Sequence, residues 1–289
     1  MLLNLEKISK KSNIAFKMIK IVKPKIWNFE VIKGKEAWKE VVYATRMSGV
    51  PETVKDEKAF EMMVENDYSS ILEHILIKFD LKITKGNAPE FLEHRIVSHT
   101  GYSTRYIKVS EGIGKETPNY EIILPLHLLK DKKIGKIILK ANESSIKTYE
   151  DLISQEIPKE IARYVLPFSQ AVGIYHVTIN LRSLLNLLSL RLCVRASPEF
   201  RCLASQIYFN LIKELPIIRG MVGCRGLMRG VCPESGVREK TPRQFKNPNS
   251  PIFIPTKEEM KKGLKIKKID LKKLIEVQEK IFRKWASWL

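Results

Sequence analysis

The chain has 289 residues, enough for one large domain or two modest ones, and 44% of them are hydrophobic, enough for a sizeable core. The mean hydropathy is -0.17, and no apolar run reaches the roughly 18 residues of a membrane span, which argues against an integral membrane protein. The formal net charge of +19 favours partners that are polyanions or phosphorylated small molecules, although a general excess of solubilising lysines explains it too.

The N-terminal stretch MLLNLEKISKKSN has a short apolar start followed by lysines. It lacks the apolar core and the small-residue cleavage site of a signal peptide, so we expect a cytoplasmic protein with reduced thiols. Cys224 and Cys232 lie in the glycine-rich basic stretch GCRGLMRGVC. A metal or redox pair is one interpretation of them. Incidental thiols are favoured, because none of the four cysteines forms a CxxC pair.

Hydrophobic spacing predicts the elements of the first third of the chain. Glu36 to Met47 and Lys55 to Asn66 have the spacing of amphipathic helices. Ile75 to Ile83 alternates between apolar and polar residues, which predicts a half-buried strand. Glu90 to Val97 is predicted to be a short helix or strand.

The second half carries stronger helix signals. Tyr149 to Ile161 is predicted to be helical and Ala171 to Thr178 to be a strand. Leu181 to Leu192 is apolar nearly all round, which predicts a buried helix. Ser197-Pro198 has the N-cap and first-turn residues of a further helix that ends before Pro216.

The C-terminal quarter is basic. Gly220 to Pro255 is rich in Gly, Pro and Arg and is predicted to be mostly irregular. Lys257 to Leu289 is amphipathic, which favours a helix docked on the main body over one on a membrane surface. We therefore expect a domain over residues 1–215 and a basic extension with a docking helix over residues 216–289.

Two polar clusters indicate an anion site. The stretch EHRIVSHTGYSTRY, Glu93 to Tyr106, combines guanidinium, imidazole and hydroxyl groups that bind phosphate oxygens, although a polar surface loop is the simpler interpretation. Arg182 and Arg191 lie in the apolar helix, where each needs an anion or an acceptor. Asn186 lies one turn beyond Arg182 on the same face, whereas Arg191 lies further around the helix.

Together the two clusters resemble the flavin-dependent thymidylate synthases. That family has Arg-His-Arg, seven residues, then Ser, usually followed by x-Arg-Tyr; the match here is Glu93-His94-Arg95, seven residues, Ser103, then Thr104-Arg105-Tyr106. Leu72-Glu73-His74, the ARYVLP stretch from Ala162 and the TINLRSL stretch from Thr178 also resemble family segments at matching separations. The resemblance covers about half the chain, from Glu73 to Glu214.

The resemblance implies an α+β fold (mixed α/β), an antiparallel sheet flanked by long helices, and a homotetramer with active sites shared between subunits. It implies reductive methylation of dUMP to dTMP, with FAD as cofactor and with NADPH and methylenetetrahydrofolate as co-substrates. It implies no metal and no catalytic cysteine, and the hydropathy already argues against a membrane partner.

The resemblance also assigns residues by position. FAD would be held by the cofactor set Ser70, His94, Arg95, Asn180, Arg182 and Asn186. The nucleotide would be held by the substrate set Ser103, Thr104, Arg105, Arg163 and Arg191. Arg191 would also be catalytic, because it would face the uracil and favour the negative charge that develops on the base.

The signature also departs from the family pattern. Glu93 replaces the first Arg, Thr100-Gly101 replaces Asn-Glu, Glu90 replaces a Gln and Tyr68 a His. A carboxylate at about 4 Å from a phosphate costs on the order of 4 kcal/mol, so these side chains point elsewhere or the ligand differs. Two alternatives stay open: a diverged paralogue that acts on another pyrimidine nucleotide or is inactive, and a nucleic-acid-binding protein that uses the basic region Gly220 to Lys268.

Overall fold

The computed structural model describes residues 19–111, 120–125, 128, 131–234, 236, 238–264 and 269–288. The chain forms two compact units, each assembled from separate segments. Unit 1 comprises Met1–Lys25, Leu81–Glu93 and Thr100–Tyr175, and unit 2 comprises Ile26–Asp80, His94–His99 and His176–Leu289. Over the described ranges, no helix has both the length and the apolar character needed to cross a membrane.

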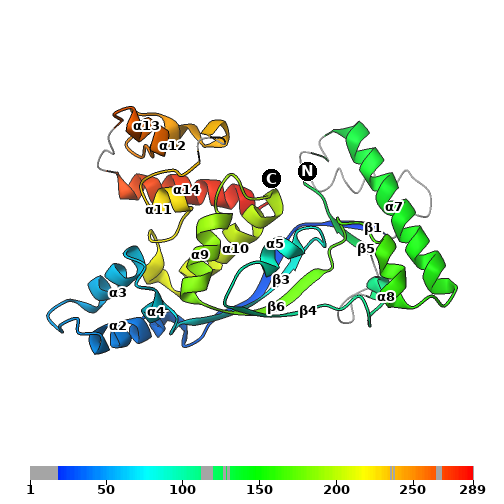
Figure 1. The fold of residues 1–289 in the computed structure, drawn as a ribbon, viewed down its shortest axis with the longest axis horizontal. Helices are drawn as coiled ribbons and strands as arrows, with labels where there is room; N and C mark the ends of the chain where they lie inside the picture. Colours follow the sequence, from blue (N-terminus) through cyan, green and yellow to red (C-terminus); the bar gives the residue numbers. More distant parts are fainter. Residues whose placement is uncertain are drawn as a thin grey trace. The chain divides into compact units, whose positions relative to one another are not determined.

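A four-stranded sheet has the order β2-β3-β6-β4, and the residues of each of its four strands are divided between the two units. The strands are β2 (Lys25–Val31), β3 (Leu76–Ile83), β4 (Val97–Gly101) and β6 (Gly173–Asn180). The predicted alternation of β3 is confirmed, because Ile77, Phe79, Leu81 and Ile83 are buried while the residues between them are partly exposed. The antiparallel sheet with long helices confirms the predicted α+β class (Figure 1).

Unit 1 contains a parallel pair of short strands and a long helix. Strands β1 (Ile19–Val22) and β5 (Tyr120–Ile123) pair in register from Ile19 with Tyr120 to Val22 with Ile123. The helices are α5 (Ala88–Leu92), α7 (Lys132–Ser154) and α8 (Lys159–Ala162), with single 3-10 turns at Val109–Glu111 and Arg163–Val165. The core of the unit lies between α7 and β5, where the rings of Tyr120 and Tyr149 meet edge to face.

The predicted helix from Tyr149 to Ile161 is wrong in its bounds. The helix α7 starts much earlier, at Lys132, because the Asp131 side chain caps the backbone N–H groups of Lys133 and Ile134. It ends at Ser154, and Pro158, which cannot donate a helical hydrogen bond, separates it from α8.

Unit 2 is mainly helical. Its N-terminal helices are α2 (Trp38–Met47), α3 (Asp56–Glu65) and α4 (Ser69–Leu72), with a 3-10 turn at Gly34–Glu36 before them. Its central helices are α9 (Leu181–Arg191) and α10 (Pro198–Glu214). The predicted start of α10 is confirmed, because the Ser197 hydroxyl accepts the Phe200 N–H at 3.3 Å.

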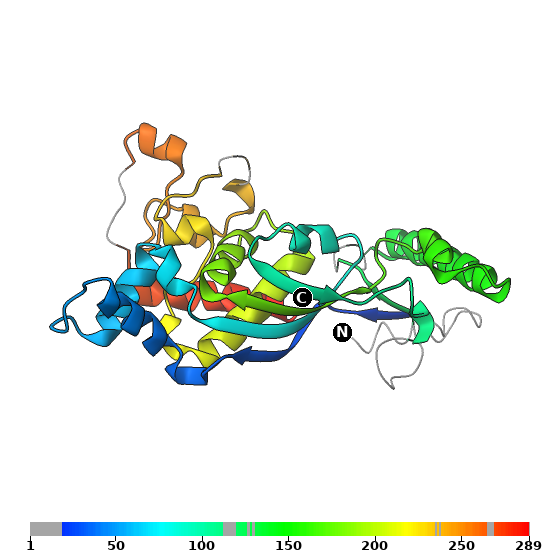
Figure 2. The same ribbon diagram turned by 60° about the horizontal axis from the view of Figure 1, so that its bottom comes forward.

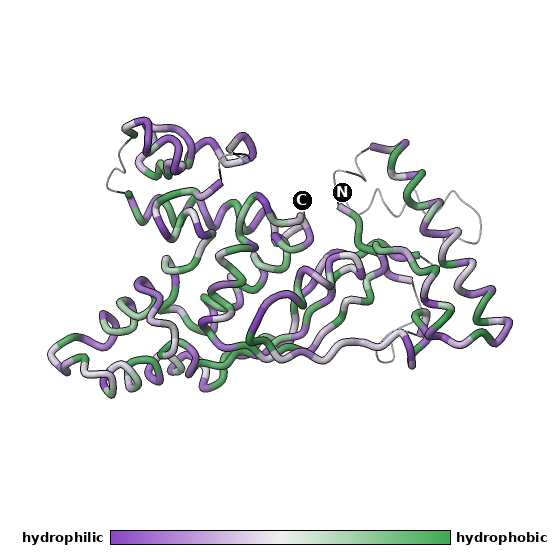
Figure 3. The backbone as a smooth tube through the Cα atoms, viewed as in Figure 1, coloured by the Kyte–Doolittle hydropathy of each residue, from purple (hydrophilic) through white to green (hydrophobic). Residues whose placement is uncertain are grey.

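The last quarter of the chain belongs to unit 2 and packs on α10. It contains α11 (Arg225–Met228), α12 (Arg243–Lys246), α13 (Lys257–Lys261), α14 (Leu271–Ala286) and 3-10 turns at Pro216–Ile218 and Arg238–Lys240. The helices α10 and α14 lie side by side in both ribbon views (Figures 1 and 2). The Phe282 ring of α14 meets the Tyr208 ring of α10 at 5.1 Å between centroids. Hydrophilic and hydrophobic residues alternate along α14 and α7, as amphipathic helices require (Figure 3).

Candidate functional site

The helix α9 carries its polar side chains on opposite faces. At about 100° per residue, Arg182 and Asn186 lie within about 40° of each other, whereas Arg191 lies about 180° from Arg182. Asn186 is exposed and the Arg182 side chain is 41% exposed. The prediction that this helix is buried nearly all round is therefore wrong on the Arg182 face.

Arg182 is held by a carboxylate of the same unit. Its Nη1 donates to Oε1 of Glu73 at 2.7 Å. Glu73 directly follows α4, and its backbone N–H donates to the carbonyl oxygen of Ser70 at 3.3 Å. Ser70 is exposed in that short helix. The structure thus brings the predicted cofactor residues Ser70 and Arg182 into one neighbourhood, with Glu73 between them.

Asn180 ends β6 and caps α9. Its Oδ1 accepts the Ser183 N–H at 2.8 Å, and the residue is 8% exposed. This contact holds the helix start in place and uses only the side-chain oxygen, so the NH2 group keeps its capacity to donate. The side chain therefore has a structural role in addition to its predicted role in cofactor binding.

The opposite face of α9 holds an arginine–histidine contact. Arg191 Nε donates to Nε2 of His94 at 3.0 Å, and the Arg191 guanidinium lies 5.0 Å from the centre of the Phe200 ring. Burial, and then the nearby Arg191 charge, lower the pKa of His94 to about 4. The imidazole is therefore neutral near pH 7. Because Nε2 accepts a hydrogen bond, the ring proton lies on Nδ1.

Residues next to His94 in the signature are exposed. Arg95, the other predicted cofactor cation of this stretch, is exposed, and so is Glu93 in place of the family's first Arg. An exposed carboxylate remains hydrated, so Glu93 imposes no buried charge on its surroundings. Glu93 follows α5, whereas Ile96 has a positive φ of 57° where the chain bends toward β4.

In unit 1, two predicted phosphate-binding arginines converge on one glutamate. Arg105 Nη2 lies 3.2 Å from Oε2 of Glu160, and Arg163 Nε donates to the Glu160 carbonyl oxygen at 3.2 Å. Both partners of the Arg105 ion pair are 51% exposed. A second anion can therefore reach these guanidiniums from solvent.

The Ser103 to Ile107 segment forms the turn that presents Arg105. The backbone N–H groups of Tyr106 and Ile107 donate to the Ser103 carbonyl oxygen at 3.3 and 3.2 Å. Thr104 is 8% exposed, whereas Ser103 is half-buried. An open hollow lies beside this turn. It is lined by Arg105 and Tyr106 of the turn and by residues at the end of α7 and just after it, Ile153, Glu156, Ile157, Pro158 and Lys159.

Gly101, which stands where the family has Glu, lies against an aromatic ring. A Cβ atom built at Gly101 would lie 2.6 Å from Cε1 of Tyr175. The Tyr175 ring in turn packs against Phe91 at 5.5 Å between centroids. The space that a side chain at position 101 would need is therefore filled by Tyr175.

The structure thus joins several predicted residues that lie far apart in sequence: His94 with Arg191, Ser70 with Arg182 through Glu73, and Arg105 with Arg163. Sequence reasoning gave no role to Glu160 or Phe200 and did not pair Glu73 with Arg182. Glu160 could have been found, because it lies three residues before Arg163 in a helical turn. Neither the contact of Phe200 with Arg191 nor the pairing of Glu73 with Arg182 had a local signal in the sequence. Over the described part of the chain, no three His, Cys, Asp or Glu side chains are grouped closely enough to hold a metal ion.

The structure shows an α+β fold with several arginines at its surface, and guanidinium groups are suited to binding phosphate oxygens. A family model described as "Thymidylate synthase complementing protein" matches residues 30–217. The chain belongs to that family.

Similar proteins agree with this assignment. The flavin-dependent thymidylate synthase of Pyrococcus abyssi is 35% identical over 172 residues, which cover 58% of this chain and 68% of the relative. That of Pyrococcus horikoshii is 33% identical over 212 residues, covering 66% and 85%. Among solved structures, the UMP/dUMP methylase PolB from Streptomyces cacaoi bound with 5-Br UMP has a TM-score of 0.57 at 21% identity, covering 69% of this chain and 94% of PolB. At that identity, the likeness concerns the fold alone.

Proposed function

We propose that this protein is an FAD-dependent thymidylate synthase, a methyltransferase that converts dUMP to dTMP with methylenetetrahydrofolate as carbon donor and NADPH as reductant. Membership of the family and the names of its curated relatives support the reaction class. The observation that carries the proposal is the convergence of Arg105 and Arg163 on Glu160. Arg105 bonds to the carboxylate of this residue and Arg163 to its backbone carbonyl, and guanidiniums near one another are suited to holding a nucleotide phosphate.

The residues present fit an anionic dinucleotide as well. Arg182 and Asn186 share an exposed face of α9, the Asn180 NH2 can donate, and Ser70 lies beside the Arg182 partner Glu73. These groups, with His94 and Arg95, would hold FAD. Bound FAD, once reduced by NADPH, supplies the hydride. The protein's part is to orient the two anions and to keep water from the reacting carbon.

Arg191 is proposed to face the uracil. A guanidinium there stabilises negative charge on the base while C5 reacts, and that charge exists mainly in the transition state. His94 positions this group by accepting its Nε–H, and a neutral imidazole adds no second positive charge beside it. His94 is thus proposed to act on the base through Arg191 as well as to contact the cofactor.

The opposite faces of α9 favour active sites shared between subunits. Arg182 and Arg191 of one helix lie about 180° apart around its axis. One bound ligand pair cannot lie along both faces of the same helix, so the two residues are proposed to serve different sites. A homotetramer in which each site takes residues from several subunits meets that requirement.

Absorbance titrations with FAD and then dUMP test the proposal. The wild-type protein should bind FAD, Arg182→Ala should weaken flavin binding, and Arg163→Ala should weaken dUMP binding. Arg195→Ala is the matched control. Arg195 is exposed, pairs with Glu234 at 2.7 Å, and belongs neither to the proposed cofactor-binding residues nor to the proposed nucleotide-binding residues. A protein that binds neither ligand would contradict the proposal.

The variant Glu93→Arg distinguishes an active synthase from a diverged paralogue. Glu93 is exposed, so the exchange disturbs no packing. A gain in flavin affinity would indicate a pocket that is otherwise preserved, whereas an unchanged affinity would place Glu93 away from the cofactor. A wild-type protein that binds FAD but methylates another pyrimidine nucleotide, or none, would identify the paralogue.

A further inference from the structure

The positive charge of this protein is concentrated outside the family domain. Residues 216–289 contain 18 lysines and arginines against 7 acids, a net charge of +11, whereas residues 30–215 contain 26 against 24, a net charge of +2. The family match ends at residue 217. Residues 1–29 carry the remaining +6, so both ends of the chain are basic and the extension holds the larger share of the charge.

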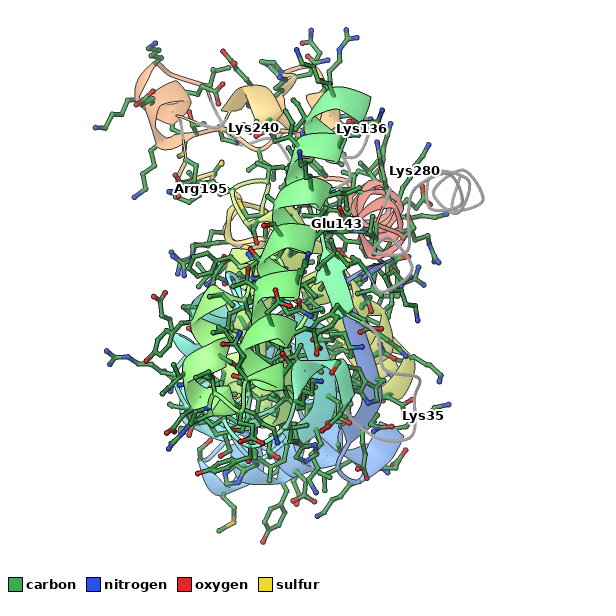
Figure 4. All side chains as sticks on the ribbon, turned by 90° about the vertical axis from the view of Figure 1, so that its right-hand side faces the viewer. Lys35, Lys136, Glu143, Arg195, Lys240 and Lys280 are labelled. Carbon is green, nitrogen blue, oxygen red and sulfur yellow. The ribbon has the colours of Figure 1, made fainter. Side chains whose placement is uncertain are left out.

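Helix α14 displays this charge on one face. At about 100° per residue, its exposed residues other than Leu271 at the helix start lie within an arc of about 120°. The arc carries five cations and a single acid, namely Lys272, Lys273, Lys280, Arg283, Lys284 and Glu276, all of them exposed. Over the described residues, only Arg283 among these cations has an ion pair, at 3.9 Å from Glu279. Lys280 is labelled in Figure 4.

The remaining faces of α14 are occupied by the protein itself. Leu274, Val277 and Ile281 pack against Phe245, Ile252 and Ile254. On another side, Glu279 accepts hydrogen bonds from Tyr208 at 3.1 Å and Arg219 at 2.8 Å, and Phe282 packs on Tyr208. Beyond the exposed Leu271 at its start, the apolar face is therefore covered by the protein itself, and the basic face points toward solvent.

The surface of the extension lacks the groups that read single-stranded bases. The exposed aromatic residues of the described chain are Tyr43, Tyr68, Tyr106, Tyr164 and Phe168, none of them in the extension. Base stacking needs such rings, whereas contact with a phosphate backbone needs only cations. From Lys272 to Lys284 the basic arc runs for about 18 Å along the helix, which spans several phosphates of a duplex.

We propose that the basic face of α14 binds the phosphate backbone of double-stranded nucleic acid, independently of base sequence and in addition to the nucleotide chemistry of the family domain. The cations at positions 273, 280 and 284 provide the contacts, and Glu276 weakens them. The protein therefore carries a small-molecule site and a polyanion site that are formed by different residues.

The test is fluorescence anisotropy of the 289-residue protein with a fluorescein-labelled RNA duplex, a DNA duplex of the same sequence and the separate single strands. Binding should be measured from 50 to 300 mM NaCl. We expect duplex binding that falls steeply with salt and does not depend on sequence. Removal of three phosphate contacts in Lys273→Gln/Lys280→Gln/Lys284→Gln should lower the salt slope by about 2.7 and weaken binding at least about tenfold at the lowest salt.

The matched control is Lys136→Gln/Lys140→Gln/Lys147→Gln, which removes three exposed lysines from α7 (Lys136 is labelled in Figure 4). It lowers the net charge equally and should leave duplex binding nearly unchanged. Glu276→Lys should tighten binding and raise the slope by about 0.9. Equal losses in both triple variants, preferential binding of single strands, or no duplex binding at 50 mM NaCl would overturn the proposal. Flavin titration of each variant verifies the fold of the family domain independently.

Discussion

Arg191 Nε donates a hydrogen bond to Nε2 of His94, 97 residues earlier in the chain, at 3.0 Å. This contact connects the two sequence clusters and fixes the protonation of the imidazole. Because the site is partly buried and the neighbouring guanidinium is positive, the ring is held neutral with its proton on Nδ1.

The first prediction concerns the titration of His94. Its pKa in the folded protein is about 4, below the ordinary 6.5, so the unfolded chain binds more protons between these values. The contribution of this group to stability is therefore fully present above about pH 6.5, falls as the pH drops toward 4, and is constant below that. NMR titration of the imidazole C–H signals should show one ring with this low pKa, assigned by its absence in His94→Gln. A normal pKa for that ring would contradict the contact.

The second prediction concerns shared active sites. If Arg182 and Arg191 of one α9 serve different sites, a hybrid of Arg182→Ala and Arg191→Ala subunits contains some sites with both arginines intact. Random mixing should restore up to about one quarter of the wild-type activity, although each variant alone is nearly inactive. Co-expression with two affinity tags yields the hybrid, and a mixture of separately assembled variants is the control. No recovery in the hybrid would mean that both residues act within one subunit.

The third prediction concerns Gly101 and Tyr175. Gly101→Ala should destabilise the protein by about 1–3 kcal/mol, because its Cβ would lie 2.6 Å from the Tyr175 ring. Most of this loss should be absent when the same exchange is made in Tyr175→Ala, which a double-mutant cycle from denaturant unfolding measures. Additive losses would show that the ring does not determine the need for glycine. Gly173→Ala is a contrasting variant. A Cβ atom at position 173 would lie 2.9 Å from the backbone oxygens of Ile83 and Thr84, and no exchange of a side chain can relieve a clash with backbone atoms.

The fourth prediction concerns thiol reactivity in the apolar pocket lined by Cys193, Cys224, Cys232 and the rings of Phe245, Phe282 and Trp285. Burial raises the pKa of the Cys224 thiol to about 12, so almost none of it is thiolate at pH 8. Cys224 should resist iodoacetamide in the folded protein and react in denaturant, as mass spectrometry of timed samples would show. Rapid alkylation of folded Cys224 would contradict this account.

The sequence predicts local features well, because their causes are local. The alternation of β3 and the Ser197 cap both follow from adjacent residues, and both are confirmed. The start of α7 was missed because its cap, Asp131, lies before a segment of mixed apolar and basic residues. The pairing of Arg182 with Glu73 could not be predicted, since 109 residues separate them and no periodicity connects them. Likewise, the half-exposed face of α9 follows from packing against neighbours, which its leucine-rich sequence does not show.

The most direct test of the proposed reaction is tritium release from [5-3H]dUMP in the presence of FAD, methylenetetrahydrofolate and NADPH. Methylation at C5 must expel the hydrogen of that carbon, so the wild-type protein should release tritium into water. Arg191→Ala should release it at least about 100-fold more slowly, while the control Arg195→Ala should retain the wild-type rate. Wild-type protein that is loaded with FAD and dUMP yet releases no tritium above the protein-free blank would contradict the assignment.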